Sequence, residues 1–314
     1  MRSIVIAICI SLLSVTCAQG QLISSRKPDG LILSTGNLYF TSHDAAGAAV
    51  WRTSQSSIPG QEGVLYWEAG AIFGDIVFAQ VNGNFFGYFF AEKAGVITIR
   101  RVSLAGGDVS VLATMDNVDV ANSHRNLVTD GVNLYWQDDS AVRKMPIGGG
   151  AVTMLDKTRP NTPTAGIALQ NGRIIYASVD DIRFVPTVGA VTDPSARTIA
   201  KASSTVTALH AVSNGVYWGE RSGAVRLKVG STITTLQSTT NFMPTSISTS
   251  GLTAGAVEAW TDCTSQSCRV HGVERFPSPH GVTFPIGANA LGLSVKPSRE
   301  VFWGDANGVH RRIF

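Results

Sequence analysis

The sequence predicts an all-β protein: a single seven-bladed β-propeller whose blades are four-stranded antiparallel sheets. Three observations lead to this fold class. A strand pattern that ends in an aromatic residue returns seven times, and each copy is followed by a strand in which an apolar residue usually precedes a basic one. Several of the intervening turns contain Asn-Gly or Asp-Gly, the dipeptides that accept the positive φ angles of tight hairpins.

The aromatic-ended strand sets the period of the repeat. It reads NLYFTS, GYFFAE, NLYWQD, RIIYAS, GVYWGE, VEAWTD and EVFWGD in chain order. The last aromatic residues are Phe40, Phe90, Trp136, Tyr176, Trp218, Trp260 and Trp303, so successive copies lie 40 to 50 residues apart. The 294 residues that follow a 20-residue leader give 42 residues for each of seven units. The repeat therefore fills residues 21–314 as one domain.

The other three strands of each unit are placed relative to the aromatic one. A small or apolar stretch such as LVTDG precedes it and is assigned to the innermost strand. The apolar-basic strand follows, as in AVRKMPI, and then a Gly or Pro turn and a Val/Thr-rich strand such as TITTL. One such sheet cannot bury both faces alone, so the units must stack. A linear solenoid is the competing arrangement, but it needs end caps that are not found in the sequence.

Residues that every blade repeats are expected to support the fold rather than to form one binding site. The tryptophans at the repeated strand position are expected to pack between blades: Trp136, Trp218, Trp260 and Trp303. The recurring arginines are expected to be hydrogen-bond or stacking partners between blades rather than anion binders: Arg100, Arg143, Arg183 and Arg226.

The final unit predicts how the ring closes. It supplies only three strands, ALGLSV, EVFWGD and GVHRRIF, while QLISSRKP at residues 21–28 has no place in the first unit. An open blade exposes an unpaired edge. We therefore predict that Leu22 to Ser25 forms the outer strand of the last blade, and that Pro28 ends it because proline cannot donate to a β-ladder.

Two of the units resemble a known repeat. LYWQDDSAVRKMPIGGG and VYWGERSGAVRLKVG are similar to the YWTD repeat of low-density-lipoprotein-receptor-type propellers, and AWTD at residues 259–262 is the closest approach to it. The resemblance implies a propeller and a secreted binding role. Propellers of that family have six blades, whereas seven units are counted here, and the Asp is absent from most copies. No functional residue is transferred for these reasons.

The first 20 residues have the pattern of a secretory signal peptide. Arg2 is followed by an apolar run from Ile4 to Val15 and by the small residues of Ala18-Gln19-Gly20 at a cleavage site. A bilayer needs roughly 20 apolar residues, so the run is too short to span it, and no later segment is long and apolar enough. Cys17 leaves a lipid-modified start open, although Ser14-Val15-Thr16 fits that pattern poorly. We expect secretion to an extracellular or periplasmic compartment.

The charge of the chain argues against nucleic acid as a partner. Without Arg2 of the leader, 24 basic residues face 22 acidic ones, a net charge of +2. No basic run exceeds a pair such as Arg100-Arg101, so no stripe of cations tracks a phosphate backbone.

Two cysteines remain after the leader. Cys263 and Cys268 lie in the polar stretch TDCTSQSCRV, and in an oxidising compartment they are expected to form a disulfide that closes a short surface loop. A redox pair or a metal site is the alternative. Four residues separate the cysteines rather than two, and His271 is the only nearby histidine.

Binding residues are sought where the copies differ. The unusual loops are residues 41–48, 114–126, 156–164 and 261–272, and propeller strand order places all four on one face. The polar candidates of this face are His43, Asp44, His124, Asp138, Asp139 and His271. The leading hypothesis is a secreted, non-catalytic platform that binds a protein, peptide or glycan through one face.

A propeller hydrolase or lactonase with a site at the mouth of the central channel is the alternative function. Such enzymes gather acidic residues or histidines from several inner strands. Asp130 is explained by its Asp-Gly turn, and His210 is the only histidine on the presumed inner strands. No catalytic, metal-binding or cofactor-binding residue is predicted, because no nucleophile elbow, phosphate loop or paired-metal spacing is present.

Overall fold

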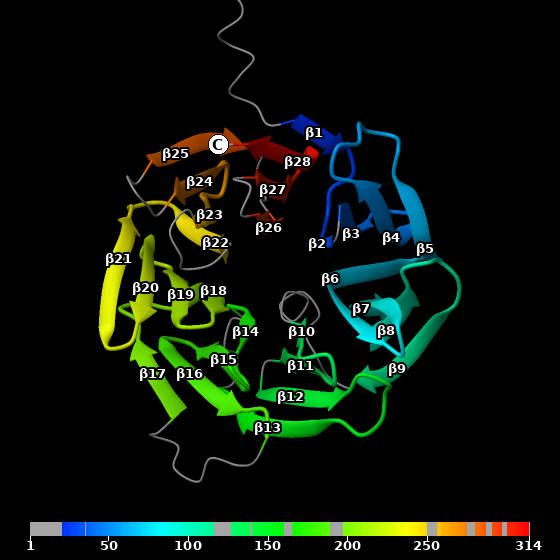
Figure 1. Ribbon diagram of the computed structural model, residues 1–314, viewed down its shortest axis with the longest axis horizontal. Coiled ribbons are helices and arrows are strands. Elements are labelled where there is room, and N and C mark those ends of the chain that lie inside the picture. Colours follow the sequence, from blue (N-terminus) through cyan, green and yellow to red (C-terminus); the bar gives the residue numbers. More distant parts are fainter. Residues whose placement is uncertain are drawn as a thin grey trace, which may run out of the picture.

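Seven four-stranded antiparallel sheets form a ring in the computed structural model of the protein (Figure 1). The residues that the structure describes are 21–34, 36–115, 127–138, 140–159, 165–188, 197–249, 256–274, 280–286, 291–296 and 300–313. Within each sheet the strands lie in chain order, except in the last, where the order is β1-β28-β27-β26. The predicted fold class, a seven-bladed β-propeller closed by an N-terminal strand, is confirmed.

The strands of the first four blades follow the predicted units. Blade 1 contains β2 (Gly30–Ser34), β3 (Asn37–His43), β4 (Gly47–Ser54) and β5 (Gly63–Ala69). Blade 2 contains β6 (Ala71–Val81), β7 (Asn84–Lys93), β8 (Val96–Ser103) and β9 (Val109–Met115). Blade 3 contains β10 (Leu127–Thr129), β11 (Asn133–Gln137), β12 (Ala141–Pro146) and β13 (Thr153–Lys157). Blade 4 contains β14 (Ile167–Gln170), β15 (Arg173–Ser178), β16 (Asp181–Pro186) and β17 (Thr198–Lys201).

The remaining three blades complete the ring. Blade 5 contains β18 (Val206–Val212), β19 (Gly215–Glu220), β20 (Ala224–Val229) and β21 (Thr232–Ser238). Blade 6 contains β22 (Met243–Thr249), β23 (Val257–Cys263), β24 (Cys268–Glu274) and β25 (His280–Ile286). Blade 7 contains β26 (Leu291–Val295), β27 (Glu300–Asp305), β28 (Gly308–Ile313) and β1 (Gln21–Ser24).

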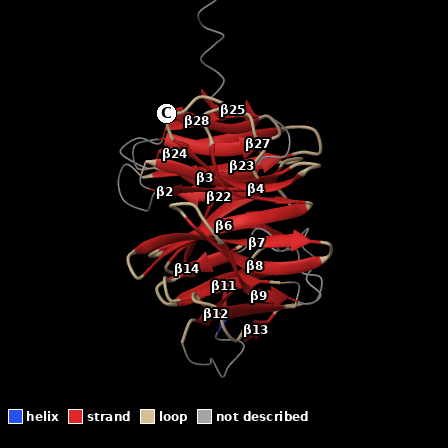
Figure 2. Cartoon of the chain, turned by 90° about the vertical axis from the view of Figure 1, so that its right-hand side faces the viewer, coloured by secondary structure: helices blue, strands red, loops and turns tan. Residues whose placement is uncertain are grey.

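The antiparallel order gives the ring two faces with different connections. Turns that join first to second and third to fourth strands lie together on one face, here named the turn face. Turns that join second to third strands, and the links between blades, lie on the other, here named the loop face. Figure 2 shows the ring from the side, with the strands crossing it and the connections gathered at its two faces.

The repeated aromatic residues form the core between blades, as predicted. Trp136 and Trp218 are fully buried, and Trp260 and Trp303 nearly so. Trp260 of blade 6 packs in one cluster with Tyr217 of blade 5. Each blade thus covers the sheet face that its neighbour cannot bury alone.

A basic residue lies directly across the β-ladder from most of these aromatic residues. The cross-strand pairs are Trp136 with Arg143, Tyr176 with Arg183, Trp218 with Arg226, Trp260 with His271 and Trp303 with His310. In four of these blades an acid stands two residues after the aromatic and pairs with a cation of the same blade: Asp138 with Arg143, Glu220 with Arg226, Asp262 with Arg269 and Asp305 with His310.

The recurring arginines therefore divide into two groups. Arg100 pairs with Glu68 of blade 1, and Arg183 lies 3.8 Å from Asp156 of blade 3, so these two connect blades as predicted. Arg143 and Arg226 pair with acids of their own blade, and for these two the prediction is wrong. The reason is the acid that their blades carry at the end of the second strand.

The N-terminal strand closes the ring. β1 pairs antiparallel with β28, with Gln21 opposite Arg311 and Ser24 opposite Val309, which confirms the predicted closure. The strand ends at Ser24, one residue before the predicted Ser25. Ile23 is fully buried against the core between blades 7 and 1.

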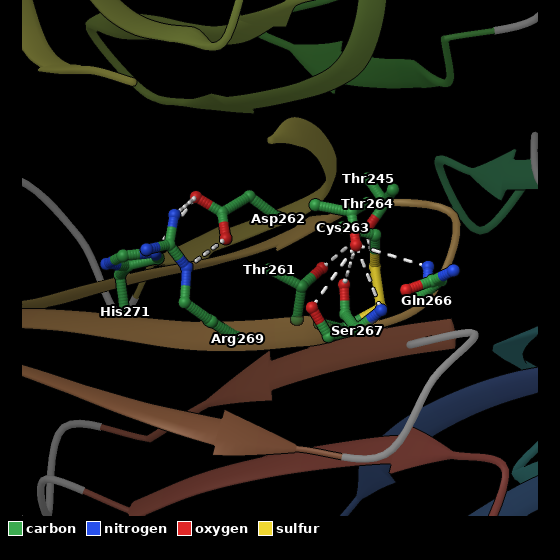
Figure 3. Close-up of a disulfide and its surroundings, with 10 residues drawn as sticks. Thr245, Thr261, Asp262, Cys263, Thr264, Gln266, Ser267, Arg269 and His271 are labelled. Atoms are coloured by element: carbon green, nitrogen blue, oxygen red, sulfur yellow. Dashed lines mark hydrogen bonds and ion pairs between the residues drawn. A yellow bond between two sulfur atoms is a disulfide. The ribbon is translucent and has the colours of Figure 1, made fainter. Parts of the chain in front are cut away.

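The two cysteines lie opposite each other at the end of the β23–β24 hairpin and form the predicted disulfide (Figure 3). Thr264 accepts backbone N–H groups of Gln266 and Ser267 inside the same turn, at 3.1 and 3.0 Å. The hairpin is thus held by its β-ladder and turn hydrogen bonds as well as by the disulfide.

Replacing Cys263 and Cys268 together with serine is expected to leave a folded ring. A disulfide that closes so short a loop removes little chain entropy from the unfolded state, so the free energy of unfolding should fall by about 2 kcal/mol at most. Urea unfolding of both proteins measures the difference. Two free thiols in the purified wild-type protein, found by mass analysis, contradict the disulfide itself.

Candidate functional site

The predicted binding residues of the loop face fall into three groups. His124 and Asp139 lie outside the described residues, as do the leader with Cys17 and most of the loop 114–126. His43 and Asp44 lie together in the β3–β4 turn. Asp138 and His271 are buried. A binding role for all six stays a prediction.

His43 and Asp44 both have local partners. The Nδ1 atom of His43 lies 2.6 Å from a carboxylate oxygen of Asp29, and this hydrogen bond raises the pKa of His43. Asp44 accepts the backbone N–H of Ala46 at 2.8 Å. The pair therefore shapes its own turn and fixes the segment that enters β2.

Asp138 belongs to the repeated network. One carboxylate oxygen accepts the backbone N–H groups of Ser140 and Ala141 at 2.9 and 2.8 Å, and the other accepts Arg143. Burial alone raises the pKa of Asp138, but the hydrogen bonds from Arg143 and Ser140 lower it below its ordinary value. The carboxylate is thus charged and already occupied by its blade.

His271 stands between a carboxylate and a hydroxyl. Its ring nitrogens lie 2.9 Å from Asp262 and 2.9 Å from Thr283, and the ring stacks on Trp260 (Figure 3 shows Asp262, Arg269 and His271). The series Asp262, His271 and Thr283 resembles a catalytic triad of acid, base and nucleophile. The same cross-strand position carries arginine in blades 3 and 5, however, and arginine cannot accept a proton. The shared role of the position is therefore structural.

Exposed apolar side chains gather on the turn face. Among the described residues, fourteen large apolar side chains are exposed, of which two, Ile72 and Val96, lie on the loop face and five lie on outer strands. The other seven lie in or beside the turns of the turn face: Ile58, Phe85, Val132, Val152, Val188, Val229 and Ile313. They come from six of the seven blades, and Val188 is 83% exposed.

Basic side chains without an acidic partner lie on the same face. Within the part of the chain that the structure describes, five of them near the turn-face ends of their strands form no ion pair: Arg52, Arg101, Lys144, Arg173 and Lys228. Arg101 and Arg173 stack over Phe86 and Phe184, with 4.8 and 4.7 Å between the guanidinium carbon and the ring centre.

The two faces therefore differ in their exposed apolar side chains. On the loop face, Arg159 pairs with Asp180 and Asp181, while the exposed Lys157 and Arg221 form no ion pair with the described residues. On the turn face, cations without an ion pair lie among seven exposed large apolar side chains. The turn face, defined by the seven apolar and five basic residues above, is the candidate functional site.

The inner strands contribute one unusual titratable group. His210 on β18 lies across the ladder from Tyr217, and burial lowers its pKa to about 4 from 6.5. Among the described residues, no group of three or more His, Cys, Asp or Glu side chains is arranged to hold a metal ion. No helix in the described part of the chain is long and apolar enough to cross a membrane.

Replacing His210 with phenylalanine is expected to reduce the loss of stability in acid. In the unfolded chain the histidine binds a proton near pH 6.5, whereas in the folded protein it does so only near pH 4. Between these values the unfolded state binds more protons, so stability falls as the pH falls. The variant lacks this contribution, and urea unfolding at pH 7.5 and 4.5 should show a smaller decrease than in the wild type.

A His43→Gln variant is the control, because the contribution of His43 to stability changes with pH in the opposite direction. The raised pKa of His43 means that its contribution is present below pH 6.5 and is lost as the pH rises through the folded value. An equal acid decrease in wild type and in the His210 variant contradicts the assigned environment of His210.

Comparison with known proteins supports the fold. No family model matches the sequence, and no curated protein matches it either. Three solved structures are similar: a chain of the mitotic checkpoint complex, the WD40 β-propeller domain of Doa1, and the computationally designed protein Ika8. The chain is a β-propeller.

The similarity spans nearly the whole ring but is low in sequence. The mitotic checkpoint chain has 12% identity and a TM-score of 0.65, and the match covers 95% of this chain and 94% of that one. For the Doa1 domain the values are 12%, 0.62, 94% and 96%, and for Ika8 they are 15%, 0.53, 94% and 100%. At this identity the likeness shows the fold alone, and the YWTD-type resemblance stays a prediction.

Proposed function

We propose that the protein is a secreted, non-catalytic binding platform that docks an acidic protein or peptide segment on the turn face. One observation carries this proposal: among the described residues, half of the exposed large apolar side chains lie on the turn face, beside five cations that form no ion pair. The propeller fold occurs in proteins of many functions and does not indicate the binding face or the partner. The proposal therefore depends on the side chains of the turn face.

The composition of the turn face suits a protein partner. Interfaces bury apolar and aromatic side chains at their centre and are enriched in arginine. Exposed Phe85 and the stacked Arg101 offer this combination in blade 2, and Arg173 offers a second stacked cation in blade 4. Isolated apolar residues are ordinary on a surface. Their concentration on one face beside free positive charge favours an acidic segment with apolar side chains.

Secretion is the second part of the proposal. The leader at residues 1–20 and the disulfide of the β23–β24 hairpin both fit an oxidising compartment. The YWTD-like repeats point the same way.

Selection from a phage-displayed library of acidic peptides tests the binding face. Peptides selected on the wild-type protein should lose about tenfold or more in affinity for the double variant Arg101→Glu with Arg173→Glu, since about 1.4 kcal/mol corresponds to tenfold. Phe85→Ser should weaken them too, and their affinity should fall as salt rises.

A matched control variant separates the effect of the turn face on affinity from the effect of the protein's net charge. Lys157→Glu with Arg221→Glu changes two exposed cations of the loop face by the same charge and should leave peptide affinity unchanged. Thermal melting of all variants verifies that they are folded. If affinity falls for this control and not for the turn-face variant, the assigned face is wrong. If the library yields no binding peptide while a glycan array shows binding of neutral oligosaccharides, the proposed partner class is wrong.

A further inference from the structure

The closing strand begins at a glutamine that directly follows the predicted cleavage site. β1 starts at Gln21, and Ala18-Gln19-Gly20 immediately precede it. Removal of the leader after Gly20 therefore leaves glutamine as the first residue of the mature protein, with no spacer before the strand that fastens the ring.

We propose that Gln21 is a modification site, at which the mature N-terminus cyclises to pyroglutamate. This inference rests on the proposed secretion. The uncharged α-amino nitrogen attacks the side-chain amide carbon, a new C–N bond closes a five-membered lactam, and the amide nitrogen leaves as ammonia. No electron transfer or co-reactant is needed, and the proton of the α-amino group leaves with the ammonia.

The local structure permits this reaction without opening the ring. Gln21 is exposed, whereas the burial that anchors the strand begins further on, at the fully buried Ile23 and Ser24. The lactam uses only atoms of Gln21 itself, so the ladder pairs of Leu22 with His310 and Ser24 with Val309 are unchanged.

Cyclisation also removes a charge from this end of the strand. A free α-amino group has a pKa near 8 and is largely cationic at neutral pH. At Gln21 it would lie opposite Arg311, which is already paired with Glu300. Lactam formation removes that charge.

The same reaction protects the closure. β1 has only four residues, so each residue that an aminopeptidase removes shortens the ladder to β28 directly. Terminal residues are common sites of proteolysis. A pyroglutamate has no free α-amino group for an ordinary aminopeptidase to recognise, so the full length of the closing strand is preserved.

Peptide mass mapping and Edman degradation of the full chain, expressed with its leader and purified from the secreted fraction, test the proposal. The expected N-terminal peptide begins at residue 21, is lighter by one ammonia than the unmodified peptide, and is blocked to Edman degradation until pyroglutamyl aminopeptidase is added. A Gln21→Ala variant should be unblocked. After incubation with a general aminopeptidase, the variant should lose residues and melt at a lower temperature, while the wild type does neither.

The possible failures are distinguishable. An N-terminus at Gln21 that keeps its free amine after prolonged incubation overturns cyclisation and leaves secretion intact. A mature chain that begins at residue 19 has two residues before β1, which contradicts Gln21 as its first residue. A retained leader overturns the proposed secretion, and this inference with it.

Discussion

Deleting residues 21–27 is expected to destabilise the whole ring, although the segment is a short terminal stretch. The deletion removes β1, leaves β28 as an unpaired edge and uncovers the core between blades 7 and 1, where Ile23 packs near Phe40 and Phe302. The deletion also removes the chain link from β1 in the sheet of blade 7 to β2 in the sheet of blade 1. Urea unfolding followed by tryptophan fluorescence should show a large decrease in the midpoint.

Single substitutions separate the packing and the backbone parts of this closure. Ile23→Ala should cost about 2–5 kcal/mol, because the side chain is fully buried. Gly308→Ala should also destabilise, because a Cβ atom there would lie 1.9 Å from the backbone oxygen of Ser24. Lys27→Ala, on an exposed residue of the same segment, is the control and should change stability by no more than about 0.5 kcal/mol. A truncated protein that unfolds at the wild-type midpoint contradicts the closure.

Trp218→Ala and Trp136→Ala are each expected to cost about 3–5 kcal/mol of unfolding free energy. Both side chains are fully buried, Trp218 in the core between blades 4 and 5 and Trp136 in the core between blades 2 and 3. The loss should appear in stability before it appears in binding. Unchanged stability in either variant means that the side chain has been wrongly assigned to packing.

Phenylalanine variants refine this prediction. Trp218 donates its indole N–H to the buried Glu220 at 3.0 Å, whereas that of Trp136 has no hydrogen-bond partner among the described residues. Trp218→Phe therefore loses a hydrogen bond to a charged group in addition to ring area, and should cost about 1–3 kcal/mol more than Trp136→Phe. Equal costs for the two variants contradict a stabilising role of the Trp218 hydrogen bond.

The repeat made most of the fold predictable from sequence, because every blade contains the same pattern of an aromatic-ended strand followed by an apolar-basic strand. The seven aromatic-ended strands, the closing strand and the disulfide are all found where the sequence places them. The partners of single polar residues depend on the strand register, which the sequence pattern does not give. His271 reads as a loop residue beside Cys268, and only the register shows that it lies opposite Trp260, where other blades carry arginine.

The candidate site was not predictable by the same route. Phe85, Val132 and Val188 occur in three separate turns, and each is unremarkable alone. They share a face only because the strand order places every first-to-second and third-to-fourth turn at one end of the ring. The sequence does show apolar residues beside turn glycines, as in TDGVN. Only the strand order shows that these residues lie on the same face of the ring.

The pairing of β1 with β28 also determines the order in which the protein can finish folding. Strand β1 has its ladder partner at residues 309–311, so the closing sheet forms only after the last blade has been synthesised. Blades 1 to 6 can assemble from local contacts while the chain is still growing, because their strands pair with sequence neighbours. The final contact spans the whole sequence and carries the largest loop-closure entropy. Until it forms, β1 has no ladder partner and one edge of β28 is unpaired, and the chain is most exposed to aggregation in that interval.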